Sequence, residues 1–103
     1  MNYVVHVTLE AECDVRQAVF YINNILYNPS ATTRLLNKIA AAIESLRLNP
    51  YRYPLVDDDH LVQQKIRLFP VKNFHLFYTI NEQNKTVSIL RFVYKKRNWP
   101  KLL

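Results

Sequence analysis

The chain of 103 residues contains no glycine and one cysteine, Cys13. Without glycine it cannot form the glycine-rich loops that hold nucleotide phosphates, which excludes the enzyme classes that depend on them. Turns that need a positive φ angle must use other residues, and we expect Asn or Asp there, because these two tolerate the left-handed region best after glycine. A single cysteine excludes an internal disulfide and fits a reducing compartment, so we predict a cytoplasmic protein.

Long apolar runs are also missing. No run reaches the length of about 18 residues that a membrane helix needs, and residues 1–9 lack the basic and apolar segments of a signal peptide. Hydrophobic residues nevertheless make up 50% of the chain, which argues against disorder. We therefore expect one folded domain over residues 1–103, without a membrane partner.

Acidic residues are scarce in the second half of the chain. Residues 61–103 carry nine Lys and Arg against one acid, Glu82, whereas residues 1–60 carry five against seven. The two net charges, +8 and −2, sum to the +6 of the whole chain. Segregated positive charge points to a polyanionic target or an acidic partner.

The first half of the chain predicts one strand and two helices. Residues 3–8 alternate as a strand does, and apolar residues recur at helical spacing over 9–27 and over about 30–48. The segment Asn28-Pro29-Ser30 separates the helices, and either Asn28 or Ser30 caps the second one. So short a link makes the two helices an antiparallel hairpin.

The second half predicts three strands, at 61–69, 74–80 and 87–94. We expect Pro70-Val71-Lys72-Asn73 to break the first from the second, and residues 81–85 to form a polar hairpin turn. The predicted fold is α+β in the order β-α-α-β-β-β. It has an antiparallel-rich sheet of about four strands, with the helical hairpin packed on one face.

The loop between the helices and these strands, residues 51–60, contains the acidic run Asp57-Asp58-Asp59. Three adjacent acids suggest a metal site, but metal ligands need convergent geometry that a solvated loop rarely supplies. We interpret the run as a solvated turn and predict neither a metal nor a cofactor.

Several stretches together resemble a known family. They are the hairpin YINNILYNPSATTRLLNKIAAAIESLRLNP, the loop YRYPLVDDDHL, the strands KIRLFPVKNFHLFYTI and the end VSILRFVYKKRNWPKLL. In this order and spacing they resemble the RelE/ParE superfamily, toxins of bacterial type II toxin–antitoxin modules of the plasmid-stabilisation type. The resemblance implies a small basic toxin that is neutralised by a cognate acidic antitoxin.

Two activities follow from this resemblance: we expect ribosome-dependent mRNA cleavage, and gyrase poisoning is the alternative that the sequence leaves open. A RelE-type toxin is an endoribonuclease that cleaves mRNA on the ribosome, and a ParE-type toxin poisons DNA gyrase without cutting RNA. Metal-independent RNA cleavage needs a proton acceptor and cations around the phosphate. By resemblance, the catalytic residues are Lys65, Arg67, His75 and Arg97, and the RNA-binding residues are Lys72, Arg91, Tyr94, Lys95 and Lys96.

Plainer explanations compete with these assignments. Lys65 and Arg67 also fit the solvated face of an amphipathic strand, and His75 also fits a hydrogen-bonded residue of the sheet. A histidine at the position of a RelE-type arginine also removes a permanent cation. The sequence does not reveal the oligomeric state.

An antitoxin needs a surface to cover. We expect it at four aromatic residues, Phe69, Phe77, Phe92 and Trp99, rimmed by cations. A disordered acidic antitoxin tail would cover this surface as a helix or as an added strand. The alternative is that the aromatic rings fill the core between the hairpin and the sheet, and for Phe77 we favour that alternative.

Overall fold

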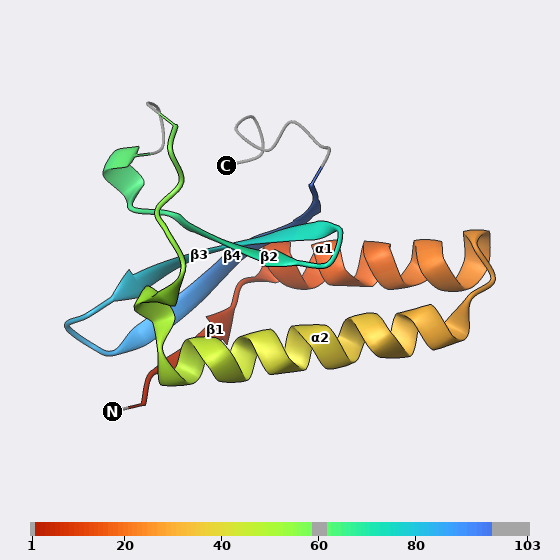
Figure 1. The fold of residues 1–103 in the computed structure, drawn as a ribbon, viewed down its shortest axis with the longest axis horizontal. Helices are drawn as coiled ribbons and strands as arrows, with labels where there is room; N and C mark the ends of the chain where they lie inside the picture. The colour runs from red at the N-terminus through yellow and green to blue at the C-terminus, as the bar shows by residue number, and fades with distance from the viewer. Residues whose placement is uncertain (1, 59–61, 96–103) are drawn as a thin grey trace.

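A computed structural model describes residues 2–58 and 62–95 of the chain. The elements follow the predicted order of one strand, a helical hairpin and three strands (Figure 1). Their bounds are β1 Val4–Val7, α1 Leu9–Phe20, α2 Pro29–Leu48, β2 Arg67–Val71, β3 Phe74–Asn81 and β4 Thr86–Tyr94. A π-helical turn, Tyr21–Ile25, extends α1, and short 3₁₀ turns occupy Pro50–Arg52 and Val62–Gln64.

The four strands form one sheet in the order β1-β4-β3-β2. β1 pairs with β4 in parallel, and the other two pairings are antiparallel. Both helices lie against the same face of the sheet, and the tip of the hairpin runs on past the sheet (Figure 1). The predicted α+β fold with a helical hairpin on one face is confirmed. In the described ranges, no helix has the length and hydropathy that a bilayer crossing requires.

Caps define where the two helices begin. The Thr8 side chain accepts a hydrogen bond from the backbone N–H of Ala11, and Glu10 and Glu12 add negative charge to the first turn of α1. The Asn28 side chain accepts from the N–H of Ala31, and Pro29 takes the first helical position of α2. Of the two caps that the sequence allowed, the structure uses Asn28.

Each face of the sheet covers a separate core. Under the hairpin, buried residues of both helices and of β2, β3 and β4 pack in one cluster, which includes Leu35, Leu46 and Tyr78. On the opposite face lies a smaller cluster that includes Phe77 and Val93. Ile89 and Val93, both from the last predicted strand, are buried but belong to different clusters. A register shift opposite Phe77 and Tyr78 leaves Leu90 unpaired in β4, which turns the next residues to the other face.

Two predicted boundaries in the second half are wrong. β2 begins at Arg67 rather than at residue 61, because Val62–Gln64 form a 3₁₀ turn and Lys65 after it has a φ of 55°. Pro70 does not break β2, which continues through Val71. β2 is an edge strand, and Pro70 lies two residues after Leu68, whose N–H points outward to the carbonyl of Pro54. The missing N–H of Pro70 therefore removes no bond from the sheet.

The expectation that Asn or Asp supplies the left-handed turns is also wrong. The four residues with positive φ are Tyr27, Lys65, Lys72 and Lys85, at φ angles of 52 to 55°. Three of them adjoin an Asn, and one of these, Asn28, uses its side chain to cap α2 by accepting from the N–H of Ala31. Asn81, which is not among the four, accepts from the backbone N–H groups of Gln83 and Asn84, which shapes the β3–β4 turn.

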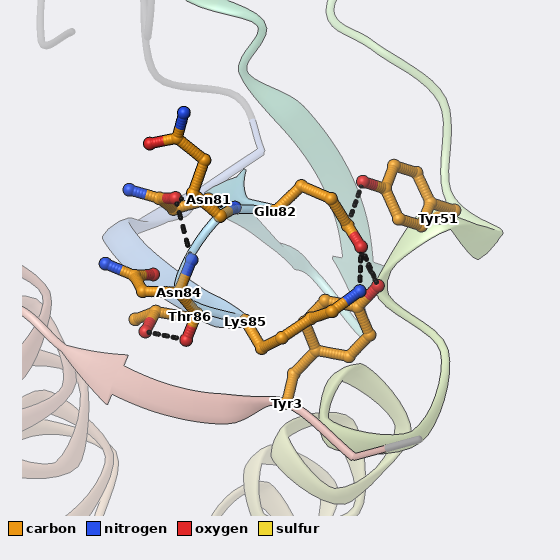
Figure 2. A network of polar contacts seen from close by, with 8 residues as sticks. Tyr3, Tyr51, Asn81, Glu82, Asn84, Lys85 and Thr86 are labelled. Carbon is orange, nitrogen blue, oxygen red and sulfur yellow. Dashed lines mark hydrogen bonds and ion pairs between the residues drawn. The ribbon is translucent and has the colours of Figure 1, made fainter.

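The end of the sheet farthest from the hairpin tip is closed by a polar network (Figure 2). Glu82 in the β3–β4 turn accepts hydrogen bonds from the hydroxyls of Tyr3, at 3.0 Å, and Tyr51, at 2.5 Å, and forms an ion pair with Lys85. The bonds from Lys85, Tyr51 and Tyr3 lower the pKa of Glu82 to about 2. Close by, the buried hydroxyl of Tyr78 donates to the carbonyl of Pro50 at 2.6 Å. The start of β1 and the segment after α2 are thereby tied to one turn.

Candidate binding groove

A groove of about 740 Å³ lies between the hairpin tip and the end of the sheet that is nearer to it, where the β2–β3 turn and the end of β4 lie. Most of its lining residues are apolar. The lining residues are Asp14, Gln17, Ala18, Tyr21, Ile22, Leu26, Ala31, Leu35, Lys72, Asn73, Phe74, Phe92 and Tyr94. Phe74 stacks on Phe92 with ring centroids 4.6 Å apart, and Tyr94 meets Phe74 edge-on at 5.7 Å. These aromatic contacts give the sheet side of the groove a fixed shape.

Asp14 holds the floor of the groove together. β1 ends beside Ile89, so the edge of β4 beyond that point has no neighbouring strand. Within the described part of the chain, the carboxylate of Asp14 occupies this edge, accepting from Arg91 at 2.7 and 2.9 Å and from the backbone N–H of Phe92 at 2.9 Å. The pair raises the pKa of Arg91, chiefly through the hydrogen bond to Asp14. Asp14 therefore joins α1 to β4 by hydrogen bonds, in addition to placing negative charge near the N-terminus of α1.

The hairpin tip exposes apolar side chains next to the groove. Five large residues of this tip are more than half exposed, namely Phe20, Tyr21, Ile25, Leu26 and Tyr27. The tip is nevertheless well formed, because the buried Thr32 hydroxyl donates to the side chain of Asn23 at 2.7 Å and joins α2 to the π-helical turn. No charged residue occurs between Arg16 and Arg34. Surfaces of this kind are typical of protein interfaces.

The residues predicted to be catalytic do not all share one face. Arg67 pairs with Tyr78 on the face beneath the helices, where its guanidinium donates to the carbonyl of Tyr53 at 2.5 Å and lies 5.1 Å from the ring centre of Tyr51. His75 pairs with Val93 on the opposite face. Lys65 is exposed in the turn before β2, and Arg97 lies outside the described residues.

His75 has an unusual environment. Its Nδ1 atom is buried and has no hydrogen-bond partner in the described part of the chain. The ring meets Phe77 edge-on at 5.9 Å. Burial lowers the pKa of His75, and the nearby charge of Lys95 lowers it further. The imidazole is thus held neutral around pH 7, which is the form that accepts a proton.

The residues predicted to bind RNA fall into three groups. Lys72 and Tyr94 both line the groove. Lys95 lies at the same end of the sheet, where its backbone N–H donates to the carbonyl of Asn73 at 2.9 Å. Arg91 is engaged by Asp14, and Lys96 lies outside the described residues.

The aromatic surface expected for the antitoxin is not found. Phe69, Phe77 and Phe92 are all buried, at exposures of 9%, 0% and 3%, and Trp99 lies outside the described residues. Strand alternation places Phe69 and Phe92 beneath the hairpin, where they fill the core, and Phe77 in the cluster on the other face. Phe77 is a core residue, as we favoured, but of the smaller core.

The exposed apolar surface of the protein is found instead at the hairpin tip, and the sequence did contain a signal for it. The 17 residues from Gln17 to Thr33 are uncharged in a chain that is 21% charged. Helical periodicity predicted a helix over residues 9–27, without showing that the helices extend beyond the sheet. As for metals, no group of three His, Cys, Asp or Glu residues is placed to bind an ion within ranges 2–58 and 62–95.

Comparison with known proteins identifies the family. Residues 5–99 match the family described as the ParE toxin of the type II toxin–antitoxin system parDE. No curated protein matches the chain at a significant level. The match covers nearly the whole chain.

Solved structures show the same fold. A chain of the toxin–antitoxin complex RelBE2 from Mycobacterium tuberculosis is 21% identical, with a TM-score of 0.62 over 91% of this chain and 99% of that one. The chromosomal ParDE system of P. aeruginosa gives 14% identity and a TM-score of 0.66 over 89% and 95%. The archaeal RelE–RelB complex from Pyrococcus horikoshii gives 13% and 0.55 over 94% and 99%.

Proposed function

Because this chain belongs to the ParE family of toxins from type II toxin–antitoxin systems, we propose that it acts by binding a protein target, DNA gyrase, rather than by cutting RNA. The observation that carries this proposal is the uncharged, exposed hairpin tip beside a groove of about 740 Å³. Exposed apolar surface favours association because binding removes it from water, at about 25 cal/mol per Å². Aromatic residues in such a surface supply much of the binding energy of an interface.

The positions of the predicted cleavage residues support the same proposal. RNA cleavage requires a proton acceptor and cations around one phosphate. Arg67 is bound to Tyr53 beneath the hairpin, while His75 faces the other way. Two side chains on opposite faces of one sheet do not reach a common phosphate. A non-catalytic toxin does not need them to do so.

We further propose that an acidic antitoxin covers the groove and the tip. Two of the structures with the same fold are toxin–antitoxin complexes. A helix with one apolar face fits an apolar groove of this kind. Lys72 at the rim and Lys95 nearby, in a chain of net charge +6, would attract an acidic segment. The toxin would then act in the cytoplasm once its antitoxin is removed.

The test uses purified gyrase and supercoiled plasmid. We expect the wild-type chain to accumulate cleaved DNA–gyrase complexes. The double variant Ile25→Ser with Leu26→Ser should need at least about tenfold more protein for the same effect. The control is Leu9→Ser with Leu48→Ser, which removes two exposed leucines at the start of α1 and the end of α2, at the other end of the hairpin. Growth arrest by a chain that leaves gyrase unaffected would overturn the proposal.

Ribosome-dependent mRNA cleavage is the second candidate, and the environment of His75 favours it. A lowered pKa keeps the imidazole of His75 neutral, which is the form that accepts the proton of a 2′-hydroxyl. Lys65, Arg67 and Arg97 would complete this site after a rearrangement. A translation extract with a defined A-site codon tests it, since His75→Ala should abolish cleavage. A message left intact by the wild-type chain excludes this candidate.

A further inference from the structure

A second, basic pocket of about 310 Å³ lies on the outer side of the hairpin, between α2 and the edge of β2. Three cations from three separate elements line it: Lys38 from α2, Arg52 from the turn after α2, and Lys72 from the β2–β3 turn. Only Lys72 belongs to the basic second half of the chain. The tertiary fold therefore assembles a cationic site that the charge pattern along the sequence does not show.

Small residues make room for this pocket. Where α2 passes β2, it presents Ala41, Ala42 and Ser45, so helix and strand do not close on each other. The inner wall is aromatic, because Tyr53 stacks on Phe69 with centroids 3.8 Å apart and planes inclined by 23°. The guanidinium of Arg52 lies 5.6 Å from the centre of the Tyr53 ring. The pocket thus combines flat π-surface with positive charge.

The charge of the pocket is not compensated. No Asp or Glu lines it, and none of its three cations has an ion-pair partner among residues 2–58 and 62–95. A cleft that gathers one sign of charge concentrates the field and attracts the opposite charge. An anion would find three donors arranged around one opening.

We propose that this basic pocket binds a segment of single-stranded nucleic acid. Its phosphates would contact Lys38, Arg52 and Lys72, and one base would pack against Tyr53 and the Arg52 plane. Charge alone fits an acidic peptide equally well, but an aromatic wall beside cations is the combination that recognises single strands. The proposal goes beyond the action on gyrase, because it concerns the free chain and a pocket whose lining shares one residue, Lys72, with the groove.

Fluorescence anisotropy with a labelled oligothymidylate of about eight nucleotides tests this inference. DNA is chosen because it has no 2′-hydroxyl and cannot be cut by a ribonuclease mechanism. The triple variant Lys38→Ser, Arg52→Ser, Lys72→Ser should lose at least about tenfold in affinity. Its slope of log affinity against log salt should fall by about 2, the value expected for three lost phosphate contacts.

A matched control separates the pocket from net charge. Arg16→Ser, Arg47→Ser, Lys85→Ser removes three exposed cations that sit in surface ion pairs elsewhere, so it has the same formal net charge as the pocket variant. It should retain most of the binding. Equal losses in the two triple variants, with both folded by circular dichroism, would overturn the proposal.

Two further measurements address the ligand. Arg52→Lys keeps the charge but removes the planar group, so it should keep the salt slope and lose affinity severalfold. Unchanged affinity in that variant would remove Arg52 from the base contact and overturn that part of the inference. A glutamate peptide of the same charge should compete poorly. Competition equal to that of the oligonucleotide would instead make the pocket a site for an acidic peptide.

Discussion

The two ends of the sheet are built from different kinds of contact. At the β3–β4 turn, Glu82 collects the hydroxyls of Tyr3 and Tyr51 and the ammonium of Lys85, and the chain is closed on itself (Figure 2). At the other end the hairpin runs past the sheet and leaves an apolar groove and tip uncovered. The polar groups at the closed end form hydrogen bonds within the chain, whereas the open end exposes the apolar surface that we propose a partner covers.

The open end still depends on one strong internal contact. Asp14 is 8% exposed and accepts three hydrogen bonds from β4. Asp14→Ala should lower the free energy of unfolding by about 3 kcal/mol, because it leaves Arg91 and a backbone N–H without this acceptor. Urea unfolding measures the effect. Glu12→Ala, which breaks an exposed pair on the same helix, should cost about 0.5 kcal/mol.

A loss below about 1 kcal/mol for Asp14→Ala would contradict this role. In that case apolar packing alone would hold the floor of the groove, and hydrogen bonds would stabilise only the closed end.

At the closed end the largest effect should come from Tyr78→Phe. The variant loses the bond to the Pro50 carbonyl, which should cost about 1 to 2 kcal/mol at neutral pH. Burial raises the pKa of Tyr78 from 10.0 to about 12. The folded state thus favours the neutral phenol, so this contribution is present below pH 10 and is lost as the pH rises toward 12.

Urea midpoints measured between neutral pH and about pH 11 test this dependence. The wild-type chain should lose stability over the upper part of that range, and Tyr78→Phe should lose less. Parallel curves for the two proteins would show that Tyr78 does not cause the loss of stability at high pH.

Relief of backbone strain at the tip should stabilise the open end slightly. Tyr27 is 82% exposed and has a φ of 52°, in the region that glycine adopts without steric cost. Tyr27→Gly should therefore raise the unfolding free energy by up to about 1 kcal/mol, the gain being limited by the extra freedom of the unfolded chain. Tyr27→Ala, which retains a Cβ atom, should show no such gain in thermal unfolding.

The smallest effect should be the acid response of the closed end. The pKa of Glu82 is lowered to about 2 from an ordinary 4.5, so its contribution is present above pH 4.5 and is lost as the pH falls toward 2. Glu82→Gln should flatten the change in melting temperature between about pH 6 and pH 3. Asp57→Asn, outside the network, serves as the control. A steeper acid limb in Glu82→Gln would contradict the network.

Much of this fold follows from local pattern. Helical spacing in residues 9–48 and alternation in β3 predicted the elements and their order, because those periods reflect which side of each element is buried. The local pattern gave wrong predictions where the position of a strand in the sheet decided the structure. Pro70 stays in β2 because β2 lies at the edge, and Ile89 and Val93 face different cores because Leu90 forms a bulge.

The candidate site was harder to predict. Lys72 and Tyr94 do lie at the groove, but the sequence does not show that Arg67 and His75 occupy opposite faces across paired strands. The exposed tip could have been found from its lack of charge. Whether its apolar residues are buried depends on how far the sheet extends beneath them.

The sequence by itself determined the family, the order of elements and the excess of positive charge, since each depends on residue types and local spacing. Only the tertiary structure decided which side chains meet. It brought Asp14 to Arg91 across 77 positions, and it brought Lys38, Arg52 and Lys72 around one pocket. The physical reason is that strand pairing and the placement of helices on a sheet are set by contacts distant in the chain, which no local period encodes.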